Sequence, residues 1–407
     1  MTPEAGMRER AVRRLARGLP VHRVIDMTRP GAWTDLDEDV RRAHRHGTPA
    51  PSRWPTLLAL VTGARVGEAR LAAALCAPDG RVREAALGRA ATVPALLPLV
   101  AIRTADWVGP VRERACAVLA AALPGSGPET LSVTAPVILR IADRMRGGEA
   151  ARLLDETLGR CPESTVTALT YHRDRPTRRL ARWAAMARNV YGPRELATLA
   201  AYDPDIVVQD RAAAAAVAAD APDETLPVLL VARSGRVRAA GVTGLRRAGR
   251  SREAEPFLYD RSAMVRACAR WVLRQEGTDP LSLYRAACAD PSGMPDRAPL
   301  GLAECGERSV DVPVLWELTG HGSPLARASA VAGLRLFDIA DRDRLMPLLA
   351  DPAPGVVRET ALALRPWAGW LPEAELLALA GAERPRHVRV RARQLLAAAG
   401  RAVPERG

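Results

Sequence analysis

The residues of this chain best suited to chemistry are its arginines, which are unevenly spread. All 59 basic residues are arginine, and the formal net charge is +13. Residues 173–194 hold seven arginines and one acid, and residues 230–275 hold eleven arginines and three acids. Guanidinium groups form paired hydrogen bonds with carboxylates and phosphates. These basic segments could therefore bind an acidic protein or a nucleic acid, or they could be the solvated faces of an arginine-rich protein.

One arginine–tryptophan phrase occurs twice, as Ala181-Arg182-Trp183 and Ala269-Arg270-Trp271. Such a pair could stack on bases or hold a phosphate beside an aromatic face. Alternatively, the tryptophan fills a gap between helices and the arginine reaches water. The candidate binding surface consists of Arg179, Arg182, Trp183, Arg236, Arg238, Arg270, Trp271 and Arg274.

Motifs for catalysis, metals or cofactors are missing from the sequence. We find no phosphate-binding loop, nucleophile elbow or dinucleotide fingerprint. The six cysteines are far apart with no Cys-x-x-Cys pair, and His44-Arg45-His46 is too short and isolated for a metal site. We therefore expect a protein with no cofactor and no metal. The start of the chain has no apolar signal core and no segment is long enough to span a bilayer, so the cytoplasm is the expected location.

The elements that position these residues follow from a phrase that recurs about every 30 residues. A turn with Asp, Pro or Gly leads into Val-Arg and then an alanine-rich segment. Copies begin at Val82, Val111, Val237, Val265, Val357 and Val388. Self-similarity at this period indicates a stack of small units rather than one globular core.

Each unit is predicted to be a pair of helices joined by the turn. The residue four places after the valine is always small, as at Ala86, Gly241 and Ala269, so the second helix should touch a neighbouring backbone there. We expect about eleven hairpins sharing one continuous apolar core. The predicted organisation is a cap at 1–56, an array at 57–400 and a tail at 401–407, with Pro124-Gly125-Ser126-Gly127-Pro128 as a long loop between repeats.

These phrases resemble the HEAT repeat, in particular its short variety known from phycobilisome lyases. The resemblance implies an all-α solenoid forming a right-handed superhelix. It also implies a ladder in which a turn aspartate and the arginine after the valine bond adjacent units. The ladder residues would be Asp106, Arg112, Asp260, Arg266, Asp351 and Arg358. Gln209 replaces the arginine in one unit and Arg238 lacks a preceding aspartate, so the ladder should be broken at both.

The predicted function is a non-catalytic scaffold or adaptor that binds a protein partner with an acidic surface through the concave face of the repeat array, which the second helices should line. The alternative is nucleic-acid binding through residues 173–194 and 230–275. The remaining alternative is a repair enzyme similar to alkylpurine DNA glycosylases, although no motif joins the tryptophans and acids it would need. The sequence indicates no membrane partner and leaves the oligomeric state open.

Overall fold

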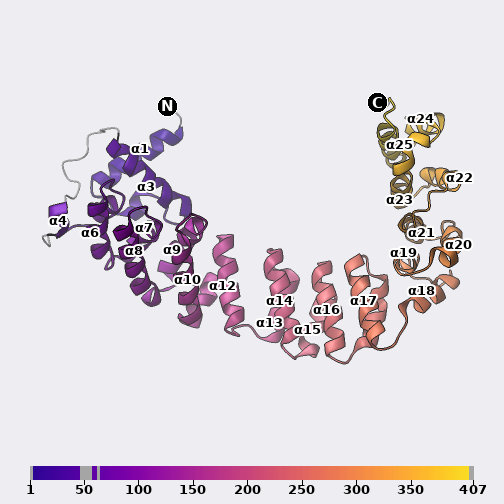
Figure 1. Ribbon diagram of the computed structural model, residues 1–407, viewed down its shortest axis with the longest axis horizontal. Coiled ribbons are helices and arrows are strands. Elements are labelled where there is room, and N and C mark those ends of the chain that lie inside the picture. The colour runs from indigo at the N-terminus through magenta and orange to yellow at the C-terminus, as the bar shows by residue number, and fades with distance from the viewer. Residues whose placement is uncertain (1–2, 46–56, 62–64, 403–407) are drawn as a thin grey trace. The chain divides into compact units, whose positions relative to one another are not determined.

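The computed structural model describes residues 3–45, 57–61 and 65–402, and every regular element in these ranges is a helix (Figure 1). The predicted all-α class is confirmed. The chain divides into two units, Met1–Gly192 and Pro193–Gly407. Residues 46–56 of the expected cap and residues 403–407 of the expected tail lie outside the described ranges.

Unit 1 begins with helices α1, α2 and α3 and continues as pairs of antiparallel helices. The bounds are α1 (Pro3–Ala16), α2 (Val21–Val24), α3 (Pro30–Arg45), α4 (Leu57–Val61), α5 (Glu68–Leu75), α6 (Gly80–Ala90), α7 (Leu97–Arg103), α8 (Gly109–Ala122), α9 (Pro128–Ile141), α10 (Gly148–Arg160), α11 (Glu163–Leu169) and α12 (Arg175–Ala187), with 3₁₀ turns η1 (Pro94–Leu96) and η2 (Leu123–Gly125).

Unit 2 consists of helix pairs throughout. The bounds are α13 (Pro193–Tyr202), α14 (Ile206–Ala218), α15 (Pro222–Leu230), α16 (Gly235–Arg247), η3 (Ser251–Tyr259), α17 (Ala263–Gln275), α18 (Pro280–Ala289), α19 (Ala298–Ala303), α20 (Arg308–Leu318), α21 (Pro324–Leu336), α22 (Arg342–Leu345), η4 (Met346–Ala350), α23 (Pro354–Leu364), η5 (Arg365–Trp370), α24 (Glu373–Ala380) and α25 (Arg386–Ala398).

The described helices form eleven hairpins, four in unit 1 and seven in unit 2, as the repeat count predicts. Hairpins 1 to 4 pair α5 with α6, α7 with α8, α9 with α10 and α11 with α12. Hairpins 5 to 11 pair α13 with α14, α15 with α16, η3 with α17, α18 with α19, α20 with α21, η4 with α23, and α24 with α25. Within each unit successive hairpins stack; α14 packs against α16, and α16 against α17 (Figure 1).

Turn residues explain why the second helices begin where they do. Asp79 accepts a hydrogen bond from the Arg81 amide, and Asp174 accepts one from the Thr177 amide, at 2.9 Å and 3.0 Å. Each aspartate thus satisfies a backbone donor that the first helical turn leaves unpaired. Proline stands in the first turn of many of the other helices, such as α15 and α21, where no amide donor is needed.

The small residue after the valine lies where two helices of one hairpin meet. A methyl group added to Gly241 of α16 would come within 3.0 Å of the Leu229 Cβ and 3.2 Å of the Leu230 amide nitrogen. Ala86 and Ala269 occupy the same position in their hairpins and are completely buried. The predicted close approach of backbones is therefore present, and it explains why larger side chains are excluded.

The ladder is formed in part, and three of its arginines, Arg83, Arg238 and Arg327, bond the aspartate of the following hairpin. Arg266 bonds Glu304 instead, and Arg112 donates to the Asp106 carbonyl of its own turn at 3.0 Å. Arg83 donates from Nε and Nη2 to Asp106, both at 2.9 Å, and from Nη1 to the Ala77 and Pro78 carbonyls. Arg327 binds Asp351 in the same way. Each of these aspartates also accepts a backbone amide two residues later, so one carboxylate organises its own turn and the preceding hairpin.

The expected break at Arg238 is wrong. Arg238 donates to Asp260 at 2.8 Å and 2.7 Å, because its partner lies in the next turn and a preceding aspartate is not needed. The other expected break, at Gln209, is present. Its amide keeps the bond to the Asp203 carbonyl at 2.7 Å, while Ala232 replaces the aspartate of the next turn. The missing arginine and the missing aspartate are the two halves of one absent rung.

The predicted role of Arg358 is also wrong, since this side chain does not take part in the ladder. Its side chain is 59% exposed and pairs with Glu359 on its own helix. Six positions separate Asp106 from Arg112 and Asp260 from Arg266, whereas seven separate Asp351 from Arg358. One extra residue rotates a helical side chain by about 100°, which turns Arg358 away from the neighbouring hairpin.

The buried apolar residues form two clusters rather than the single continuous core that the repeat predicts. One runs from Leu15 to Ala185 in unit 1, and the other from Leu226 to Leu396 in unit 2. Hairpin 5 belongs to neither. The inner face of α14 is largely alanine, including Ala212, Ala213 and Ala216, whose methyl groups bury little apolar area.

Candidate binding surface

The predicted surface residues are divided between the two units. Arg179, Arg182 and Trp183 lie on α12 of unit 1, where all three are half-buried. Arg236, Arg238, Arg270, Trp271 and Arg274 lie on α16 and α17 of unit 2. The structure brings together only part of the predicted set, and the members in unit 2 have very different surroundings.

Two of the predicted surface arginines are structural, which corrects their assignment. Arg238 is buried in the ladder rung to Asp260. Arg270 donates from Nη1 to Glu304 at 2.5 Å, and the same carboxylate accepts two bonds from Arg266. Burial alone would raise the pKa of Glu304, but hydrogen bonds from Arg266 and then Arg270 hold that pKa below its usual value. Arg270 is therefore paired inside unit 2.

Arg236 is exposed at the first turn of α16, where it bonds Asp210 of α14 at 2.5 Å. It is ten residues from Arg246, which is about 15 Å along the helix axis. Trp271 and Arg274 lie near the other end of the second helices. The structure therefore separates Arg236 from Trp271 and Arg274, although the sequence grouped them.

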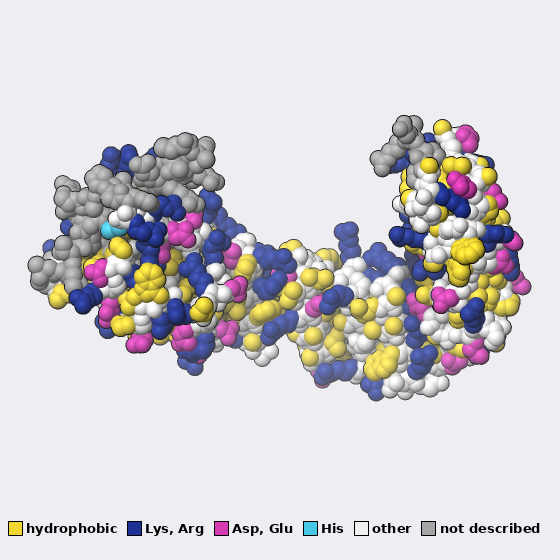
Figure 2. Space-filling model, turned by 45° about the horizontal axis from the view of Figure 1, so that its top comes forward, with side chains coloured by type: hydrophobic (Ala, Val, Ile, Leu, Met, Phe, Trp, Pro, Cys, Tyr) yellow, Lys and Arg dark blue, Asp and Glu magenta, His cyan; other side chains and the backbone are white. Residues whose placement is uncertain are grey.

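The last turns of α16 and α17 carry a surface that we call the second-helix patch: Arg246, Arg247, Trp271 and Arg274. The Arg246 guanidinium lies 5.3 Å from the centre of the Trp271 ring. This contact joins two adjacent hairpins through a cation–π interaction. Arginine side chains, in dark blue, occur on many parts of the face of the molecule drawn in Figure 2.

The register of the repeat explains why these side chains share a face. Arg246 lies eight residues after the ladder arginine Arg238, and Arg274 lies eight residues after Arg266. Equivalent positions on stacked helices point the same way. Arg246 and Arg247 were missed as members of the candidate set, although this spacing could have identified Arg246.

The second-helix patch is basic, although Asp279 lies near Arg274: hydrogen bonds from Ser282 and Leu281, and to a smaller extent the charge of Arg274, lower the pKa of Asp279. Among the described residues, no acidic side chain forms an ion pair with Arg246, Arg247 or Arg274, and all three are exposed. The nearby Arg250 shows the contrast, because it pairs with Asp223 at 3.0 Å and with Glu253 at 2.7 Å. The patch thus offers three guanidinium groups and one indole ring to a ligand.

A different charged cluster lies where α3 packs against hairpin 2 in unit 1. The buried Arg103 bonds both Asp37 of α3 and Asp106 of the ladder, and Arg41 bonds Asp37 at 3.1 Å. Burial raises the pKa of Asp37, although Arg41 opposes that effect. Asp37 of α3 thus attaches the first helices to the ladder through Arg103.

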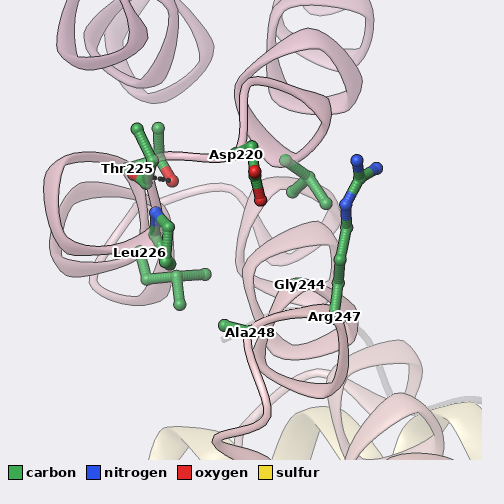
Figure 3. A pocket seen from close by; sticks show the side chains of 9 residues that line it. Asp220, Thr225, Leu226, Gly244, Arg247 and Ala248 are labelled. Carbon is green, nitrogen blue, oxygen red and sulfur yellow. Dashed lines mark hydrogen bonds between the residues drawn. The ribbon is translucent and has the colours of Figure 1, made fainter.

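The pocket between α15 and α16 is too small for chemistry on a ligand. The pocket in Figure 3 lies between α15 and α16, with Leu226 and Ala248 on its walls and Arg247 at its rim. Its free volume of about 20 Å³ is close to the space of one water molecule. Within the described ranges, no group of three or more His, Cys, Asp or Glu residues is arranged to hold a metal ion.

The six cysteines are free thiols. Burial is the main reason that the pKa of each thiol is raised, most strongly for Cys76 and to about 12 for Cys288. A raised pKa keeps the thiol protonated, and the thiolate is the reactive form. These side chains therefore act as small apolar groups in the packing.

No protein family model matches the chain, and no curated protein matches it. Solved structures that are similar include an engineered protein with 18% identity, covering 96% of this chain and 99% of that chain at a TM-score of 0.22. The karyopherin Kap121p bound to the extreme C-terminus of the phosphatase Cdc14p has 12% identity, with 91% and 50% coverage and a TM-score of 0.28. A tumor overexpressed gene (TOG) domain array of microtubule polymerases has 10% identity, with 90% and 91% coverage and a TM-score of 0.21.

This chain spans about half the length of the karyopherin it matches. The fold assignment rests on the hairpins and their ladder, which define a HEAT-like helical-repeat protein. Among the described helices, none combines the length and the apolar character needed to cross a membrane.

Proposed function

We propose that this protein is a non-catalytic scaffold or adaptor that binds an acidic surface of a protein partner through the second-helix patch. The observation that carries this proposal is the group of exposed arginines Arg246, Arg247 and Arg274 beside Trp271. We further propose that the repeats belong to the short, phycobilisome-lyase-like variety, which their spacing of about 30 residues supports.

The patch has the composition of a protein-binding hot spot. Tryptophan and arginine are the residues most enriched among side chains that dominate binding energy. Arg246 is already held over the Trp271 ring, so less rotamer freedom is lost when a carboxylate of the partner binds it. The ladder pairs Arg238–Asp260 and Arg266–Glu304 fix the helices beneath.

Nucleic-acid binding is the alternative, because an Arg–Trp pair can also stack on a base. Six of the eleven arginines in residues 230–275 form ion pairs or side-chain hydrogen bonds inside unit 2, however. These are Arg236, Arg238, Arg250, Arg261, Arg266 and Arg270. Nucleic-acid affinity grows with the number of phosphates that a protein neutralises. Because these six arginines are already bonded within unit 2, fewer remain to bind phosphates, and nucleic-acid binding is the weaker alternative.

A photo-reactive phenylalanine derivative placed at position 271 tests the proposal in a lysate of cells that naturally express the protein. We expect adducts with protein, and we expect the double substitution Arg246→Glu and Arg274→Glu to remove them. The matched charge control is Arg384→Glu and Arg386→Glu, two exposed arginines of hairpin 11. Adducts that nuclease digests would support the nucleic-acid alternative, and adducts unaffected by either pair of substitutions would reject this surface.

A further inference from the structure

A second surface of unit 2 lies along the turns of hairpins 5, 6 and 7, away from the last turns of the second helices. It carries large apolar side chains that face solvent: Tyr202 is 76% exposed, Val231 77% and Met264 52%. Ile206 and Val207 of α14 are exposed beside them. We call these five residues the turn-edge strip.

The members of the strip hold equivalent places in successive hairpins. Tyr202 and Val231 each lie seven residues before the ladder position, which is Gln209 in hairpin 5 and Arg238 in hairpin 6. Val207 and Met264 each lie two residues before it, in hairpins 5 and 7. The strip is thus generated by the repeat and runs across the stack.

Direct contacts hold these turns side by side. Arg261 donates from Nη2 to the Arg233 carbonyl at 2.8 Å, which joins the turns of hairpins 6 and 7. A Cβ on Gly235 would come within 2.8 Å of the Ser262 Oγ, so the start of α16 touches the next turn. Arg236 and Asp210 join α14 to α16. The exposed apolar groups therefore lie on one supported edge.

The distance between successive hairpins determines which peptide spacing would match the strip. Packed helices are separated by about 8–10 Å. A peptide in the extended polyproline II conformation advances about 3.1 Å per residue and, with three residues per turn, presents every third side chain to the same face. Such a peptide lying across the turns therefore meets a new hairpin at about every third residue.

The charges along the edge determine which side chains of the peptide would fit between its apolar residues. Arg233 and Arg261 are exposed there and form no ion pair with the described residues, whereas the exposed Arg236 is already paired with Asp210. Asp205 caps α14 and Asp260 holds Arg238, so these turn acids are already bonded inside the unit. The edge therefore favours carboxylates between the apolar contacts.

Other occupants fit this surface less well. Tyr202 is the single aromatic residue among the five of the strip, and the aliphatic side chains of the other four, such as Val231 and Met264, give bases no stacking face. A second copy of the strip would bring its own arginines against these arginines. An acidic and apolar peptide satisfies both features.

We propose that the turn-edge strip binds an extended segment of a partner protein with apolar side chains at every third position and Asp or Glu between them. This proposal does not depend on the second-helix patch, and it adds a second contact surface to the proposed adaptor.

The test uses the full chain and a fluorescent synthetic peptide of about ten residues, with leucine at every third position and glutamate elsewhere. Fluorescence anisotropy should show saturable binding. A peptide of the same composition with its leucines consecutive should bind at least about tenfold more weakly. Val231→Ser combined with Met264→Ser should weaken binding of the spaced peptide by a similar factor, because both side chains are anchors.

Trp367→Ser combined with Trp370→Ser is the matched control, since both tryptophans are exposed in η5, between α23 and α24 and outside the strip. Arg246→Glu with Arg274→Glu should also leave peptide binding unchanged, which separates this proposal from the second-helix patch. Equal binding of both peptides, or unchanged binding by the Val231→Ser and Met264→Ser protein, would overturn the proposal. Displacement of the peptide by single-stranded DNA but not by unlabelled peptide would also overturn it.

Discussion

Arg238 and Asp260 are joined by two parallel hydrogen bonds, from Nε at 2.8 Å and from Nη2 at 2.7 Å, across two consecutive hairpins. The same guanidinium donates to the Ala232 and Arg233 carbonyls, so its binding capacity is largely used. This pair shows how the repeats stack: a charge at the start of one second helix is neutralised by the turn of the next hairpin.

Breaking this pair should destabilise unit 2 strongly. Arg238→Ala leaves the carboxylate of Asp260 without its charged partner, and loss of one member of a buried pair costs about 3–5 kcal/mol. Arg236→Ala, which removes an exposed partner of Asp210, should cost about 0–1 kcal/mol. Urea denaturation followed by circular dichroism would measure both, and equal effects would contradict the ladder.

The absent rung between hairpins 5 and 6 can be rebuilt. Gln209→Arg alone should destabilise the protein, because the new guanidinium would face Ala232 rather than a carboxylate. Adding Ala232→Asp should recover that loss and give a coupling free energy of about 1 kcal/mol or more in a double-mutant cycle. Strictly additive effects would mean that the spacing of the two positions is not that of the other rungs.

Gly301 of α19 is required by the buried ring of Tyr284. A Cβ at this position would lie 2.2 Å from the Tyr284 Cε1, and the ring is fixed because its hydroxyl donates to the Leu258 carbonyl at 2.7 Å. Gly301→Ala should therefore cost at least about 1–3 kcal/mol through overpacking. Gly369→Ala is the control, since its Cβ would meet no atom within 4 Å. A melting temperature unchanged in both variants would contradict the packing.

Stability should fall in acid. Burial alone would raise the pKa of Asp260 and Asp351, but hydrogen bonds from Arg238 and Arg327 lower these pKa values below 3.8. The pKa of Glu304 is likewise held below 4.5. Because the folded-state pKa is below the unfolded one, this stabilisation is present above about pH 4.5 and is lost as pH falls through the folded values.

Urea midpoints measured across the acid range would show this decline. Asp260→Asn should make the decline shallower, because one carboxylate with a lowered pKa is gone. Asp37 acts in the opposite direction, since burial raises its pKa and its contribution weakens as pH rises. A steeper acid decline in the Asp260→Asn protein would contradict the assignment.

The repeat predicted the fold well because it combines three independent signals: the period, the small residue at one position and the turn chemistry. Gly241 and its close contact with Leu229 are an example of a packing constraint readable from sequence. The partners of the ladder arginines were not readable, because Asp260 and Arg266 look like a local pair six residues apart. Only stacking shows that Asp260 faces Arg238 of the preceding hairpin.

The binding surface was predicted less well, because the sequence does not show whether an arginine on a helix is paired inside the protein or exposed to solvent. Arg270 and Arg274 lie four residues apart on α17, yet Arg270 reaches Glu304, 34 residues later. Hairpin 8 has a long turn between α18 and α19, so the position of Glu304 does not follow from the period. Arg246 could be placed beside Trp271 only through the shared register of α16 and α17.

Hairpin 5 has a consequence for how unit 2 opens. It lacks a rung to hairpin 6, and its alanine-lined helices lie outside the main apolar cluster of that unit. Segments with few buried apolar contacts open at a lower free energy than the rest of a protein. The backbone amides of α13 and α14 should therefore exchange with deuterium before those of α16 and α17, which makes Tyr202, Ile206 and Val207 the most adaptable part of the edge that they share with Val231.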